Sequence, residues 1–142
     1  MCTTLARLNY QLIRIAVLLL AIGTILGGLW ADVSWGRFWG WDPKEVGALV
    51  SLLVYLVVLH GRHVGYRGDL SMAAGSVLGF TAILLTWFVV NFWMGGKHSY
   101  GEGGAEQWVV AGCLTAVTVN LLFLALAALR AWLQSRRTTA GA

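Results

Sequence analysis

A dense group of aromatic residues follows the first long apolar segment of the chain. Residues 35–45 read W-G-R-F-W-G-W-D-P-K-E, with three tryptophans and a phenylalanine within seven positions. Tryptophans at a membrane–water interface commonly form an aromatic belt, which is one interpretation. In the other, Gly36 and Gly40 allow tight turns that aim several rings at one large planar apolar ligand, whose acidic groups Arg37 and Lys44 would meet. The pattern alone leaves both interpretations open.

Three histidines are the candidate metal ligands of the chain. His98 follows the third apolar segment, within G-G-K-H-S-Y-G at residues 95–101. A single loop histidine is most often a solvated surface residue, but the aromatic platform and the flanking glycines favour an axial ligand of haem iron. His60 and His63 lie at the end of the second apolar segment, beside a basic loop, and the residues alone favour interfacial histidines there.

Four apolar segments must position these residues. The chain has 142 residues, of which 58% are hydrophobic and 11% charged, and its mean hydropathy is +0.73. Soluble domains carry about 25% charged residues, and about 20 apolar residues cross a bilayer as a helix. We predict an all-α membrane protein, a single transmembrane domain over residues 1–142 whose four helices form a bundle. The spans are 12–30, 41–59, 72–94 and 108–129, and the second reaches spanning length if its helix starts near Asp42-Pro43.

The distribution of basic residues predicts the orientation. Seven of the ten lie in the two tails, in the loop 60–71 or at a helix end beside them, and three lie in the loops 31–43 and 95–107 or at the helix start beside them. The positive-inside rule therefore places both termini and the loop 60–71 in the cytoplasm and the other two loops outside. A net charge of +4 distributed in this way predicts the lipid bilayer as the partner and no nucleic acid. The first segment has spanning length and no small-residue cleavage site after it, so we expect no cleaved signal peptide.

Several segments of the sequence together resemble a known protein family. The segment 35–45, followed by Val54-Tyr55, Leu59-His60 and the H-S-Y-G run that begins at His98, is similar to the cytochrome c assembly proteins. These are haem-handling membrane proteins with a tryptophan-rich "WWD" segment. Asp-Pro-Lys-Glu and His-Ser-Tyr indicate the CcsA (ResC) branch. The resemblance extends over about residues 18–129 and corresponds to the C-terminal half of the family's proteins.

The resemblance implies a role for particular residues. It implies a haem-binding subunit of a cytochrome c biogenesis system that presents haem b at the outer face to apocytochrome c. His98 would be an axial ligand of the outer haem iron, and His60 a ligand that guides haem from the cytoplasmic side. The membrane would be a bacterial inner (plasma) membrane or a thylakoid-type membrane. The haem-presenting segment would comprise Trp35, Gly36, Trp39, Trp41 and Asp42.

The chain departs from the family pattern in its histidines. Family members are roughly twice as long, and their first half supplies a second outer histidine and a second membrane histidine. No histidine precedes Trp35 here. Either a second membrane subunit or a second copy of the chain supplies the missing ligands, or the protein is a divergent relative that holds haem with fewer ligands.

The resemblance makes the chain at most part of a haem-lyase (synthase) complex. Its contribution would be positioning, with no side chain of its own acting as nucleophile. One alternative is a membrane electron-transfer subunit, which usually needs paired histidines at bundle depth. All three histidines here are predicted at helix ends or in loops, which speaks against it. Another alternative is a structural subunit of a larger complex that retains the motif without haem.

Overall fold

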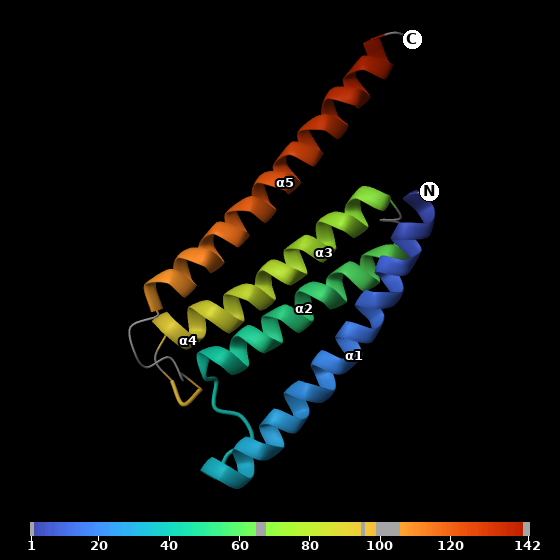
Figure 1. The fold of residues 1–142 in the computed structure, drawn as a ribbon. Coiled ribbons are helices and arrows are strands. Elements are labelled where there is room, and N and C mark those ends of the chain that lie inside the picture. Colours follow the sequence, from blue (N-terminus) through green and yellow to red (C-terminus); the bar gives the residue numbers. More distant parts are fainter. Residues whose placement is uncertain (1, 65–67, 95, 99–105, 141–142) are drawn as a thin grey trace.

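The structure is a computed structural model that describes residues 2–64, 68–94, 96–98 and 106–140, and all the regular secondary structure within these residues is helical (Figure 1). The elements are α1 (Cys2–Trp35), α2 (Pro43–Val64), α3 (Asp69–Leu84), the π-helix η1 (Leu85–Val89), α4 (Val90–Trp93) and α5 (Glu106–Ala140). α3, η1 and α4 follow one another without a break and form one rod. Four helices in the described part are long and apolar enough to cross a membrane, which confirms the predicted fold class.

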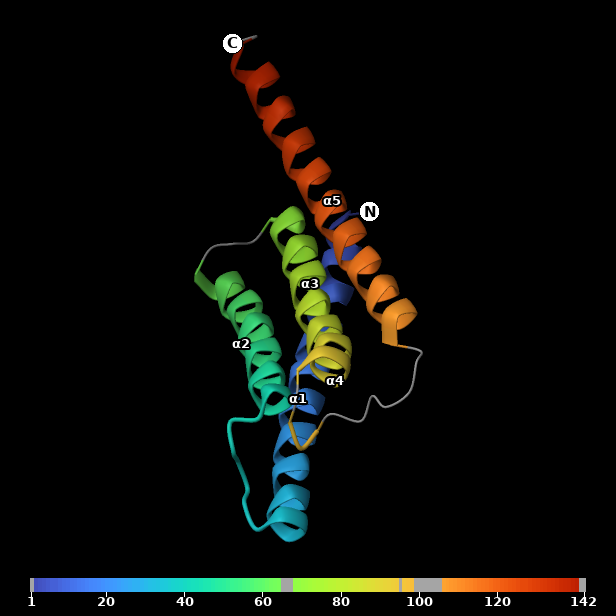
Figure 2. The same cartoon turned by 90° about the vertical axis from the view of Figure 1, so that its left-hand side faces the viewer.

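The two ends of the molecule differ in what they carry. One end of the molecule, here called the terminal end, holds the N-terminus of α1 and the C-terminus of α5 (Figures 1 and 2). The C-terminus of α2 and the N-terminus of α3 also lie there. Residues 36–42 and 96–98 lie toward the opposite end, here called the tryptophan end. Both termini thus share one side of the bundle. Their location in the cytoplasm stays a prediction.

The helices run further than the apolar segments that predict them. α1 begins at Cys2 and ends at Trp35, so residues 36–42 alone connect it to α2. α2 begins at Pro43 and continues to Val64, into the predicted loop 60–71. Helices longer than the hydrocarbon core tilt or extend into the interface, where polar residues are tolerated. Of the predicted loop 95–107, the described part contains 96–98 and the start of α5.

Small residues allow α2 and α3 to pack closely. Gly75 and Gly79 of α3 are buried, and a Cβ atom on either would overlap the side chain of Val58 or Tyr55 of α2. Close approach through small residues is a common basis of helix packing in lipid. In α1, a Cβ atom on Gly23 would meet nothing within 4 Å. The glycine pair of α3 therefore serves helix packing, whereas the pair in α1 meets no neighbouring atom among the described residues.

One cluster of the buried core lies in the half of the bundle near the terminal end. Ile13, Tyr55 and Met72, one from each of α1, α2 and α3, form this cluster. Asn9 of α1 donates a hydrogen bond of 2.6 Å to the hydroxyl of Ser76 on α3. These contacts join the first three helices into one unit.

α5 packs on the edge of this unit. Val110 and Cys113 are buried near its first turns, and the Cys113 thiol lies 3.7 Å from the carbonyl oxygen of Leu84. α5 contacts α3 and η1 and then diverges from them toward the terminal end (Figure 1). The described part of α5 contributes no residue to the site at the tryptophan end.

Candidate haem-ligand site at the tryptophan end

A left-handed glycine ends α1 directly after Trp35. Gly36 has a φ angle of +69°, and its N–H donates to the carbonyl oxygen of Asp32 at 2.9 Å. Glycine adopts this backbone conformation without a Cβ clash, which makes it the usual residue just beyond a helix C-terminus. Gly36 thus turns the chain back and leaves Trp35 as the last residue of the helix.

A capping box begins α2. Asp42 is the N-cap: its carboxylate oxygen Oδ1 accepts the backbone N–H of Lys44 at 3.1 Å, and its carbonyl oxygen accepts the N–H of Val46 at 2.9 Å. Glu45, three residues on, accepts the N–H of Asp42 at 3.1 Å through Oε2. Pro43 occupies the first helical position, where its missing N–H costs nothing. The Asp-Pro-Lys-Glu sequence is therefore a helix start.

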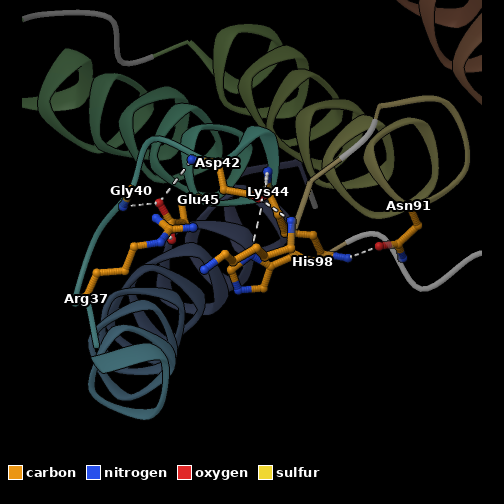
Figure 3. A network of polar contacts seen from close by, with 8 residues as sticks. Arg37, Gly40, Asp42, Lys44, Glu45, Asn91 and His98 are labelled. Atoms are coloured by element: carbon orange, nitrogen blue, oxygen red, sulfur yellow. Dashed lines mark hydrogen bonds and ion pairs between the residues drawn. The ribbon is translucent and has the colours of Figure 1, made fainter. Parts of the chain in front are cut away.

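Contacts with Glu45 and with α1 fix the segment 36–42, which connects α1 to α2. The Oε2 atom of Glu45 also accepts the N–H of Gly40 at 2.8 Å, and its Oε1 lies 3.7 Å from the Arg37 guanidinium (Figure 3). The ring of Phe38 packs so closely on Gly28 of α1 that a Cβ atom at Gly28 would lie 2.7 Å from the ring. The segment is thereby held at both its middle and its end.

His98 lies at the centre of the site. Its Nδ1 atom is buried and lies 3.3 Å from Oδ1 of Asp42 (Figure 3). Its ring makes an edge-to-face contact with the indole of Trp35, with 4.7 Å between centroids and 81° between planes. The ammonium of Lys97 lies 5.6 Å from the Trp35 ring centre, and the Arg37 guanidinium 6.0 Å from it. One imidazole, one indole and two cations therefore meet at one place.

Asp42 is an anion despite its burial. Burial acts to raise the pKa of this carboxyl, but the donated backbone N–H groups of Lys44 and Lys97 and the adjacent His98 outweigh that effect. The pKa of Asp42 consequently lies below its ordinary value. A carboxylate therefore faces Nδ1 of His98 at neutral pH.

The donor set suits a metal that is already held by a macrocycle. Within the described residues, no three His, Cys, Asp or Glu side chains gather to bind a bare ion. A single imidazole is, however, a usual axial ligand of haem iron. The adjoining cavity, lined among others by Gly28, Trp39 and His98, measures about 120 Å³. Pockets that enclose drug-sized ligands measure about 300–1,000 Å³. The residues around this cavity can contact one side of a haem, but the cavity is too small to enclose it.

The structure brings Trp35, Trp39, Asp42 and His98 together and directs Trp41 elsewhere. Trp41 is 71% exposed and contacts Trp39 edge-to-face at 6.1 Å between ring centroids. It also begins a separate apolar groove of about 540 Å³ between α2 and the α3–η1–α4 rod. Its φ angle of +57° is left-handed, a conformation that costs a non-glycine residue about 1–2 kcal/mol. Such strain is often found at binding sites.

His60 lies at the other end of α2. Its Nδ1 atom is 2.7 Å from the carbonyl oxygen of Leu56, and the side chain is exposed. At a rise of about 1.5 Å per residue, His60 lies about 25 Å along α2 from Pro43. His60 and His98 therefore cannot ligate the same iron in this chain. The backbone of His63 lies in the last turn of α2.

Sequence reasoning missed several residues that build the site. Glu45 and Gly28 hold the connecting segment, and a Cβ atom on Gly96 would come within 2.5 Å of the Asp42 carboxylate. A capping signature, Asp followed three residues later by Glu, was present in the sequence and identifies the role of Glu45. Lys44, expected to meet acidic groups of a ligand, donates a hydrogen bond to Asn91 in this structure, and its role toward a ligand stays a prediction.

The fold and the site together define a class: an integral membrane protein of four long helices with an aromatic, histidine-bearing site at one end. The family model described as cytochrome C assembly protein matches residues 2–98. The chain belongs to the cytochrome c assembly protein family. The match includes all of α1 and ends at His98, so α5 lies beyond it.

Individual relatives support the same assignment. The chain is 43% identical over 100 residues to protein NrfI of Wolinella succinogenes, a match covering 70% of this chain and 11% of that protein. It is 38% identical over 99 residues to the cytochrome c biogenesis protein CcsA of Gloeobacter violaceus, covering 69% and 29%. With CcsA of Trieres chinensis the identity is 42% over 94 residues, covering 66% and 30%. The matched segment thus spans less than a third of these relatives. No solved structure is significantly similar to the chain.

Proposed function

We propose that the chain is a haem-binding subunit of a cytochrome c biogenesis system that presents haem at the outer membrane face to apocytochrome c. His98 is the axial ligand of the haem iron, and Trp35 and Trp39 support one side of the macrocycle. Haem supplies the iron and the vinyl groups that receive the thioether bonds. The chain's own residues orient that haem and expose its reactive edge.

One observation carries the proposal: the imidazole of His98 lies between the Asp42 carboxylate and the Trp35 ring, at the end that holds the tryptophan segment. Family membership makes haem the ligand to expect at such a site. Lys97 and Arg37, both within about 6 Å of the Trp35 ring, supply cations for the propionate groups of haem.

A partner completes the proposed site. His98 is the only one of the three histidines at the tryptophan end, and the cavity beside it is too small to enclose a haem. A second membrane subunit, or a second copy of the chain, would supply the opposite axial ligand. His60 would receive haem at the terminal end, where its Nδ1 contact with the Leu56 carbonyl leaves Nε2 as the ligand atom.

An electron-transfer cytochrome is the weaker alternative. That role requires two ligands on one iron within the bundle, and His60 and His98 lie at opposite ends of α2. A structural subunit without haem remains distinguishable by experiment, since such a subunit would purify without a Soret band from a haem-competent host.

Replacement of the ligand tests the proposal. His98→Ala should shift the Soret and visible bands of the haem-loaded protein and increase haem loss during purification. Added imidazole should partly restore the spectrum, because it enters the vacated coordination position. His63→Ala, at the terminal end of α2, serves as the control and should leave the bands of the haem at the tryptophan end unchanged. Unchanged haem content and an unchanged spectrum in His98→Ala would show that the ligand assignment is wrong.

A further inference from the structure

The carboxylate of Asp42 joins two segments that are far apart in the sequence. Oδ1 accepts the N–H of Lys44 in the first turn of α2, and Oδ2 accepts the N–H of Lys97 at 2.8 Å, 55 residues further along the chain. The side chain is 4% exposed. Asp42 is therefore more than a helix cap, because it also anchors the backbone immediately before His98.

Gly96 shows how closely this second segment approaches. A Cβ atom on Gly96 would lie 2.5 Å from Oδ2 of Asp42 and 3.1 Å from its Cγ atom. Any other side chain would displace the carboxylate or the backbone. The approach through Gly96 is what lets Lys97 donate its N–H to Asp42 and places His98 beside the same carboxylate.

The imidazole of His98 has little freedom in this arrangement. Nδ1 lies 3.3 Å from Oδ1 of Asp42, and the planes of the His98 and Trp35 rings stand at 81° to each other in an edge-to-face contact. A carboxylate beside one ring nitrogen favours the tautomer that carries its proton there, which leaves the lone pair on the other nitrogen. Metal-binding histidines commonly hold such a partner, which fixes the ring and raises its basicity as a ligand.

We propose that Asp42 is a positioning residue for the axial ligand. Its carboxylate, 3.3 Å from Nδ1 of His98, favours the proton on that nitrogen, so that Nε2 is the atom offered to the iron with its lone pair free. Asp42 itself does not touch haem, because both its oxygens are engaged and the side chain is buried. This inference rests on the proposed function of His98 and gives the aspartate of the tryptophan segment a role that acts through that histidine.

Asp42→Asn is the informative variant. Asparagine is nearly the same size and is also a good N-cap, so the start of α2 should persist. It removes the negative charge that faces Nδ1 and turns one oxygen acceptor into an N–H₂ donor. The control is Asp32→Asn, which removes one charge near the same end from a side chain that is exposed.

The first measurement needs no haem. Long-range proton–nitrogen NMR of the full, haem-free chain labelled with ¹⁵N-histidine reports which ring nitrogen carries the proton, and His98→Ala assigns the signals of His98. The native chain should show the Nδ1–H tautomer of His98, and Asp42→Asn should populate the Nε2–H tautomer. A native chain whose His98 is predominantly the Nε2–H tautomer would overturn the inference without recourse to any variant.

The second measurement is the midpoint potential of the haem-loaded full chain. An anionic partner makes imidazole a stronger donor and favours ferric iron, so Asp42→Asn should shift the potential to a more positive value. Asp32→Asn should shift neither the potential nor the tautomer. If Asp42→Asn behaves like Asp32→Asn in both measurements, Asp42 is only a helix cap. If His98→Ala leaves the haem spectrum unchanged, the proposed function itself fails, whereas the tautomer result still reports on the Asp42–His98 pair.

Discussion

Glu45→Ala tests whether the capping box holds the tryptophan segment in place. Glu45 accepts the N–H groups of Gly40 and Asp42 and lies 3.7 Å from Arg37, while its side chain is 9% exposed. The substitution removes all three contacts and leaves the apolar residues of the segment unchanged. We expect the connection between α1 and α2 to open more often while the bundle stays folded.

The contacts set the expected magnitude. Loss of an N-terminal capping interaction costs about 1 kcal/mol. A partly buried N–H left without its acceptor costs about a further 1–3 kcal/mol, and the value is at the low end here because water reaches the exposed Gly40. The total is about 2 kcal/mol. Since every 1.4 kcal/mol is a factor of ten, the open population of the segment should rise about 30-fold.

Hydrogen-exchange mass spectrometry measures that population directly. The amides of Gly40 and Asp42 should exchange about 30-fold faster in Glu45→Ala, and peptides from the middle of α2 should exchange at the native rate. Glu45→Gln should give a smaller effect because it keeps an acceptor oxygen. Asp32→Ala, which removes an exposed charge at the same end, should have none. Native exchange at Gly40 and Asp42 in Glu45→Ala would refute the capping-box account.

Three further predictions concern the ligand, the orientation and the packing. Trp39→Ala combined with Trp41→Ala should lower haem occupancy, measured by absorbance, severalfold, since each ring contact contributes about 0.5–1.5 kcal/mol. The membrane yield of the protein, measured by immunoblot, should stay near normal. An equal loss of haem occupancy and of membrane yield would show that the tryptophans are structural. A cysteine at Ser34, in a chain whose native cysteines are replaced by serine, should react with an impermeant maleimide from the outer side of intact cells, and labelling only after lysis would reverse the topology. Gly79→Ala should lower thermal stability in detergent by about 1–3 kcal/mol through overpacking, whereas Gly23→Ala, which meets open space, should not. Equal melting of the two glycine variants would contradict the packing of α2 on α3.

The helices could be predicted because apolar length and charge are local properties. The start of α2 is a clear case, because Pro43 marks a first turn even though the unbroken apolar run begins only at Val46. Packing could not be predicted in the same way. Gly75 and Gly79 share their spacing with two glycines of α1, and only the three-dimensional arrangement shows which pair meets another helix.

The residue types of the site could be predicted from the sequence, but the contacts between its residues could not. Trp35, Trp39 and His98 could be grouped from their pattern and from the side of the membrane predicted for their loops. Trp41 was grouped with them, but its left-handed backbone directs its ring outward. The contact of Asp42 with His98 joins positions 56 residues apart, and no local signal reports such a distance.

Resonance Raman spectroscopy of the ferrous haem-loaded protein tests the central claim, ligation of haem iron by His98, most directly. A five-coordinate ferrous haem with a histidine ligand shows an iron–imidazole stretching band. Ligation by His98 predicts this band in the native protein, its loss in His98→Ala, and its return at a shifted frequency when imidazole is added. An iron–imidazole band that is identical in the native protein and in His98→Ala would contradict it.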